Sequence, residues 1–145
     1  MLAATERRVP AHTSEPVNES ILREAKARVR ACSTDPARID DRLKKLDKEW
    51  DIERTLEANA ATLAFVGTLL GFSAHRYFLA IPAVVTGFLF QHALQGWCPP
   101  LPVLRRLGFW TAREISDERN ALKAVRGEYE GSAGNPELAF QAASS

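Results

Sequence analysis

The sequence predicts an all-α protein built on a two-helix transmembrane hairpin that is flanked by amphipathic cytoplasmic helices. Two apolar stretches in the centre of the chain, residues 55–74 and 77–94, carry this prediction, and only His75 and Arg76 separate them. Each stretch has about the ~20 residues that a helix needs to cross a bilayer core of ~30 Å. Arg76 is the only Lys, Arg, Asp or Glu between residues 58 and 94.

The overall composition fits one small domain and excludes some function classes. Nineteen Lys and Arg against eighteen Asp and Glu leave a formal net charge of +1, whereas nucleic-acid binders usually show a basic excess on one face. We therefore expect no nucleic-acid partner. Two cysteines, Cys32 and Cys98, are too few for a disulfide framework. The N-terminus lacks the apolar core of a secretory signal.

The N-terminal third predicts a flexible segment followed by amphipathic helices. Residues 1–17 are interrupted by prolines and show no hydrophobic period, so we expect them to be flexible. Residues 18–54 then predict cytoplasmic amphipathic helices. The first of these is basic, begins near Asn18 or Ser20 and runs to Cys32.

A second helix is predicted to start at Asp35-Pro36, where Asp serves as N-cap and Pro occupies the first helical position. Its apolar residues recur at steps of four, three and four on a helix that is otherwise charged. We expect this stripe to bind a protein partner or to dock on the C-terminal helix around residues 112–126. The stripe consists of Ile39, Leu43, Leu46 and Trp50. The helix leads into the first apolar stretch either directly or with a bend near Asp51.

The central hairpin, residues 55–94, has one alternative, a soluble four-helix bundle that buries both apolar helices. Every helix of so small a bundle should keep a polar face, yet Thr62 and Thr68 are the only polar residues between residues 60 and 72. Threonine hydroxyls can bond to their own helix and cost little in lipid. The pattern therefore favours membrane insertion.

Basic residues predict the orientation of the hairpin. The chain before the first stretch and after the second carries most of them, whereas the turn has Arg76 alone. The positive-inside rule then places both termini in the cytoplasm. The flanking basic residues are Arg42, Lys44, Lys45, Lys48, Arg54, Arg105, Arg106 and Arg113.

Small residues spaced along the first apolar stretch predict close helix packing. They are Ala60, Ala64, Gly67 and Gly71, and the last two form a G-x-x-x-G. Small side chains four apart let two helix backbones approach closely in lipid. Two interpretations stay open: this face packs on the second helix of the same chain, or it forms a homodimer.

The chain after the hairpin predicts a cytoplasmic loop and one capped helix over residues 95–127. Prolines follow the second stretch, Thr111 and Glu114 form a capping box, and Gly127 closes the helix in a left-handed conformation. Residues 128–145 are rich in small polar residues and predict a disordered tail.

Chemically reactive groups are few. His92 and Asn59 each lie 15 residues from the hairpin turn, which is roughly 22 Å at 1.5 Å per residue, so both should lie near the cytoplasmic rim. Cys98 follows a helix C-terminus, whose negative dipole would raise a thiol pKa. A structural zinc site needs four ligands and no further Cys or His has useful spacing. We expect no metal, no cofactor and no enzymatic activity.

The entry Asp51-Ile52-Glu53-Arg54, the exit Gly96-Trp97-Cys98-Pro99 and the segment LRRLGFWTAREISDERNALKAVRG carry a family resemblance. Over residues 50–127 the chain resembles the transmembrane domain of the YgaP-type inner-membrane rhodanese family, as a stand-alone member without the rhodanese domain. That bacterial domain is of unknown function. The resemblance implies a location in the bacterial inner membrane, and in fused members a homodimer whose rhodanese domain handles persulfide sulfur.

Two functional hypotheses follow. In the first, the protein is a membrane scaffold or accessory subunit whose partners are the lipid bilayer and either itself, as a homodimer, or a larger membrane complex. In the second, it is a thiol-dependent sulfur-handling or small-anion transport component that uses Cys98 and His92.

Overall fold

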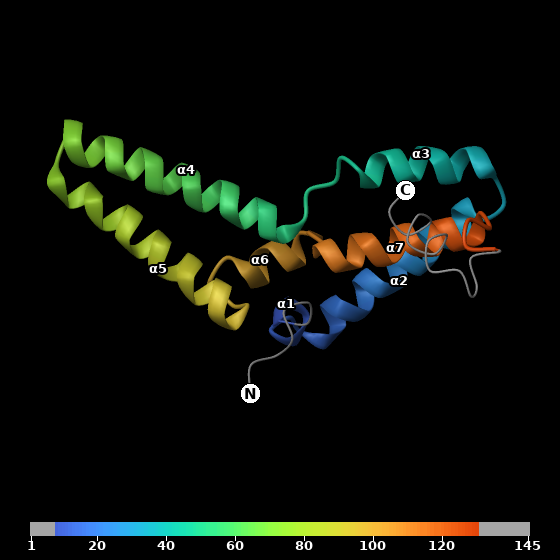
Figure 1. Ribbon diagram of the computed structural model, residues 1–145. Helices are drawn as coiled ribbons and strands as arrows, with labels where there is room; N and C mark the ends of the chain where they lie inside the picture. Colours follow the sequence, from blue (N-terminus) through green and yellow to red (C-terminus); the bar gives the residue numbers. More distant parts are fainter. Residues whose placement is uncertain (1–7, 131–145) are drawn as a thin grey trace. The chain divides into compact units, whose positions relative to one another are not determined.

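The computed structural model describes residues 8–130, and this part of the chain is helical with no strand (Figure 1). The all-α prediction is confirmed for these residues. The part of the predicted tail that follows residue 130 lies outside the described residues. The helices are α1 (Arg8–Ala11), α2 (Glu15–Cys32), α3 (Pro36–Leu46), α4 (Ile52–Ser73), the 3₁₀ turn η2 (Arg76–Leu79), α5 (Ala80–Gln95), α6 (Leu101–Arg106) and α7 (Ala112–Val125).

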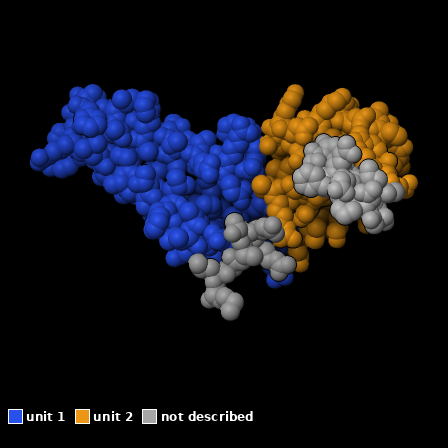
Figure 2. Space-filling model, in the orientation of Figure 1, with its two compact units in different colours: residues 1–18, 50–111 blue, residues 19–49, 112–145 orange. Residues whose placement is uncertain are grey.

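The described chain divides into two compact units (Figure 2). Unit 1 contains residues 8–18 and 50–111, and unit 2 contains residues 19–49 and 112–130. Helix α2 contributes its first turn to unit 1 and its remainder to unit 2. Each unit has contacts of its own.

Unit 1 is dominated by α4 and α5, which pack against each other and are joined by η2 (Figure 1). Helix α4 has 22 residues, and η2 with α5 forms a second run of 20 residues. Both are long and apolar enough to cross a membrane. Only 17% of the most apolar part of α4 and none of that of α5 is buried. These helices therefore are not the covered core of a soluble bundle in this structure.

Three threonine hydroxyls on the two apolar helices donate hydrogen bonds within their own helix. The hydroxyls of Thr62 and Thr68 donate hydrogen bonds to the carbonyls four residues earlier, both at 2.7 Å. Thr86 donates in the same way to the carbonyl of Pro82, at 2.6 Å. This confirms the expected threonine bonding, which lowers the cost of placing these residues in lipid.

The base of unit 1 has a small hydrophobic core formed by Val9, Ile52, Leu56, Cys98 and Leu101. Residues 8–17, part of the segment predicted to be flexible, contain α1 and the start of α2, and Val9 of α1 belongs to this core. A tertiary contact at the end of α5 explains this: the Nη1 atom of Arg8 donates to the carbonyl of Ala93 at 2.7 Å. That carbonyl lies in the last turn of α5, where carbonyls lack partners within the helix.

Gly96 ends α5 in a left-handed conformation, with φ of 72°. A Cβ atom at Gly96 would lie 2.1 Å from the Cβ of Arg8. Glycine is therefore required here for two reasons, its backbone conformation and the close approach of α1.

In unit 2, α3 packs against α7. Asp35 caps α3 as predicted, since its Oδ1 accepts from the amide of Ala37 at 3.0 Å. Gly127 follows α7 with φ of 85°. The amide of Glu128 bonds the carbonyl of Lys123, and that of Gly127 bonds the carbonyl of Ala124, which together form a Schellman motif. The predicted glycine cap is confirmed.

Candidate functional site

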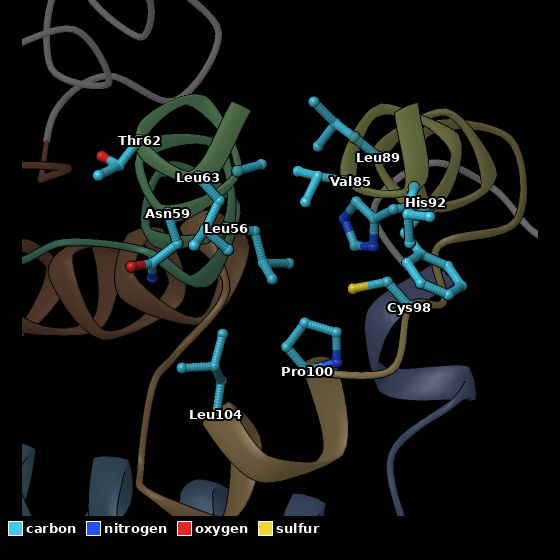
Figure 3. Close-up of a pocket in the computed structure, with 13 residues that line it drawn as sticks. Leu56, Asn59, Thr62, Leu63, Val85, Leu89, His92, Cys98, Pro100 and Leu104 are labelled. Atoms are coloured by element: carbon cyan, nitrogen blue, oxygen red, sulfur yellow. The ribbon is translucent and has the colours of Figure 1, made fainter. Parts of the chain in front are cut away.

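The most distinctive concave feature of unit 1 is a cavity of about 480 Å³ between α4 and α5, with α6 beneath it (Figure 3). Its volume lies within the ~300–1,000 Å³ range that is usual for ligand pockets. Most of its lining is apolar and includes Leu56, Leu63, Val84, Val85, Phe88 and Leu89.

The cavity exists because α4 and α5 touch near their turn and diverge away from it (Figure 1). At the contact, a Cβ atom on Gly67 would lie 2.8 Å from Cδ of Pro82, and one on Gly71 would lie 2.4 Å from Cδ2 of Leu79. Both glycines thus serve packing within the chain. Of the two interpretations of the small-residue face, the structure supports the intrachain one for Gly67 and Gly71.

Ala60 and Ala64 extend the same predicted face towards the base of α4. Both are partly buried, and Ala60 lines the cavity. The two glycines therefore form the contact between the helices, whereas Ala60 lies beside the cavity, where the helices are further apart. The Cβ atom of Ala60 fits there for that reason.

His92 and Cys98 both point into the cavity (Figure 3). The Nδ1 atom of His92 is buried and has no hydrogen-bond partner among the described residues. Asn59 lines the same cavity, which agrees with the expected similar depth of Asn59 and His92. Its amide nitrogen, however, donates to the carbonyl of Thr55 at 2.9 Å and so bonds its own helix.

Cys98 is a free cysteine and is only 4% exposed. Burial raises the pKa of its thiol above the ordinary value of 9.0, against a smaller opposing effect from the backbone amide of Leu101. A buried thiol with a raised pKa has little of the nucleophilic thiolate form near neutral pH. The geometry therefore brings Cys98 and His92 to one cavity but does not activate the thiol.

The predicted partner-binding stripe does not form one continuous surface. Helix α3 ends at Leu46. Ile39 and Leu46 are buried, at 3% and 2% exposure, and Leu43 is half-buried. Trp50 lies beyond the helix, in unit 1, and is 48% exposed. Most of the stripe thus packs inside unit 2, as in the alternative in which it docks on the C-terminal helix, and only Trp50 remains widely accessible.

Trp50 precedes α4 and is covered on one face by a cation. The guanidinium carbon of Arg54 lies 4.5 Å from the ring centroid of Trp50. This is cation–π geometry. It holds a large aromatic side chain just before the apolar helix α4.

The chain was compared with protein-family models, with curated proteins and with solved structures, and none of the three comparisons found a match.

Sequence reasoning missed a buried ion pair in unit 2. The carboxylate of Glu118, whose side chain is fully buried, accepts from Nε and Nη2 of Arg42 at 2.7 and 2.8 Å. This hydrogen bond raises the pKa of Arg42 above its ordinary value. Arg28 lies 3.8 Å from the same carboxylate, and Glu49 lies 3.3 Å from Arg42. On α7 the position of Glu118 between Ile115 and Leu122 was the only signal in the sequence that this carboxylate faces inward.

Arg105 is a buried cation in unit 1, at 1% exposure. Its guanidinium donates to Thr13, Asn18 and the carbonyl of Phe109, at 3.2, 2.9 and 3.2 Å. Arg105 is one of the flanking basic residues on which the predicted orientation rests. It instead ties the N-terminal segment to α6.

Proposed function

We propose that this chain is a small membrane protein whose α4 and α5 form a transmembrane hairpin, and that it acts as a scaffold or accessory subunit of a membrane complex. The observation that carries this proposal is the uncovered apolar surface of two consecutive spanning-length helices. The exposed aromatic side chains include Phe65 at 64%, Phe72 at 83% and Phe90 at 67%. A soluble monomer rarely exposes apolar patches larger than a few hundred Å².

The cytoplasmic placement of both ends rests on the basic residues that flank the hairpin. Arg106 and Arg113 remain exposed after α5, and Lys44, Lys45 and Lys48 remain exposed before α4. With Arg76 alone at the turn, the distribution favours termini in the cytoplasm. The resemblance to the YgaP-type transmembrane domain supports the bacterial inner membrane as the location.

The scaffold role rests on unit 2, whose helices α3 and α7 are held together by contacts within the unit. A buried carboxylate–guanidinium pair and the apolar residues Ile39, Leu46 and Leu122 stabilise the packing of α3 on α7. A unit with a defined surface, attached to a membrane hairpin, suits the presentation of contacts to a larger membrane complex or to a second copy. Trp50 is the accessible member of the predicted stripe.

Two experiments test this proposal. Alkaline carbonate extraction should leave the protein in the membrane fraction, and reporter fusions at residues 40, 76 and 130 should show positions 40 and 130 inside and position 76 outside. Extraction into the soluble fraction would refute the membrane assignment, and an external signal at 40 or 130 would refute the orientation.

Partner binding is tested by crosslinking in native membranes and purification in mild detergent. We expect Trp50→Ala to reduce a co-purifying protein severalfold while leaving membrane insertion unchanged. Phe72→Ala removes a more exposed aromatic near the other end of α4, at 83% against 48% for Trp50, and serves as the control. Equal recovery of partners from both variants would remove Trp50 from the interface.

The second candidate function, a thiol-dependent component, is favoured by one observation, the shared cavity of Cys98 and His92 (Figure 3). A Cys98→Ser variant separates the two hypotheses. The scaffold function predicts that this variant keeps its partners and its phenotype, whereas a thiol-dependent function requires that it loses activity.

A further inference from the structure

We propose that the cavity between α4 and α5 binds one acyl chain of a membrane phospholipid, with the ester region of that lipid at His92. This inference rests on the proposed transmembrane hairpin. It adds a specific lipid-binding site to a chain that the proposed function leaves in contact with bulk lipid only.

The length of the cavity matches one leaflet. Its lining runs from Leu56 to Leu63 on α4 and from Val84 to His92 on α5. At 1.5 Å per residue these stretches are about 11 and 12 Å long. Half of a ~30 Å hydrocarbon core is about 15 Å. The cavity thus extends over most of one leaflet and ends where Gly67 meets Pro82.

The width of the cavity selects a slender occupant. A volume of about 480 Å³ over about 12 Å gives a mean cross-section of roughly 40 Å². An α-helix with side chains is about 10–12 Å across, which is roughly 80–110 Å². This cross-section is about half that of an α-helix, so the space between α4 and α5 favours a hydrocarbon chain over a helix.

The chemistry of the lining changes along the cavity in the order that a phospholipid requires. Apolar side chains such as Leu63, Val85 and Phe88 line the part between the helices, and His92 and Cys98 lie at the end nearest α6 (Figure 3). The imidazole of His92 lines this end of the cavity. A ring N–H of an imidazole can donate to an ester carbonyl.

The test counts phospholipids that stay with the purified full-length chain. Protein extracted from membranes is exchanged into lipid-free detergent, and native mass spectrometry measures the bound lipid. Ala60→Phe fills the cavity, and Ala61→Phe, at the exposed neighbouring position outside the lining, is the matched control. Val85→Phe fills the cavity from α5. It keeps the test valid if one of the two filling variants fails to fold.

We expect the wild type and Ala61→Phe to retain one phospholipid per chain. Both filling variants should retain at least about tenfold less phospholipid than the wild type. His92→Leu should weaken retention about tenfold, as loss of one hydrogen bond implies. Equal retention in Ala60→Phe, Val85→Phe and Ala61→Phe would show only nonspecific surrounding lipid and would overturn the inference. Loss of a dimer from the filling variants, without bound lipid in the wild type, would assign the cavity to a second copy and would also overturn it.

The two proposals fail in different ways. If carbonate extracts the wild-type protein, the transmembrane hairpin and the lipid site both fall. If the protein stays in the membrane but retains no phospholipid, the lipid site alone is wrong.

Discussion

Replacing Glu118 by Ala should destabilise unit 2 without changing unit 1. The Glu118 side chain is fully buried and holds both Nε and Nη2 of Arg42, at 2.7 and 2.8 Å. Removing it leaves the Arg42 guanidinium, whose side chain is 16% exposed, with Glu49 at 3.3 Å as its remaining carboxylate.

Breaking a buried ion pair by removing one partner typically costs about 3–5 kcal/mol, because an uncompensated charge stays buried. Partial exposure of Arg42 and the contact with Glu49 favour the lower end, about 3 kcal/mol. That free energy corresponds to a factor of roughly 150 in the equilibrium for opening of unit 2. The double variant Arg42→Met with Glu118→Leu should recover most of the loss, since apolar replacement of both partners is often neutral.

Hydrogen exchange measured by mass spectrometry on the intact protein in detergent is the suitable assay. Amides of α3 and α7 that exchange only when unit 2 opens should exchange roughly 100-fold faster in Glu118→Ala. Peptides from α4 and α5 are an internal control and should not change. Arg119→Ala removes the exposed pair with Asp47, and should cost less than about 1 kcal/mol.

Two results would refute this reasoning. Exchange of α3 and α7 within about twofold of the wild type in Glu118→Ala would show that the pair contributes little. A double variant as damaged as the single one would show that the loss comes from packing and not from an unpaired charge.

Two further predictions concern unit 1. Gly67→Ile should lower the yield of inserted protein severalfold, because its Cβ would lie 2.8 Å from Cδ of Pro82. Gly87→Ile is the control and should not lower the yield, because a Cβ there would meet no other part of the chain within 4 Å. Equal yields would disprove the intrachain contact. Cys98 should react with iodoacetamide more slowly than the less buried Cys32 at pH 8, and its rate should reach half-maximum only above pH 9.0, because burial raises the pKa of Cys98. The unfolded thiol ionises first, so stability should begin to fall as the pH rises past the ordinary thiol pKa of 9.0 and should level off above the raised pKa of folded Cys98. Faster labelling of Cys98 than of Cys32 at pH 8 would contradict the raised pKa.

Local signals in the sequence were sufficient for the long helices. The Asp35-Pro36 start, the Gly127 cap and the two apolar stretches act over a few residues each, and the structure has helices at these places. The short helices α1 and α6 were not predicted. They depend on contacts such as that of Arg8 with the end of α5, which joins residues 85 positions apart.

The sequence by itself determined that this chain is helical and that two of its helices are long and apolar enough to span a membrane. The tertiary structure decided which surfaces those helices use: Ile39 and Leu46 turn inward, Gly67 and Gly71 meet the neighbouring helix, and Glu118 meets Arg42 across 76 positions. The physical reason is that helix formation depends on residues three or four apart, whereas a cavity or an ion pair depends on which distant helices pack together.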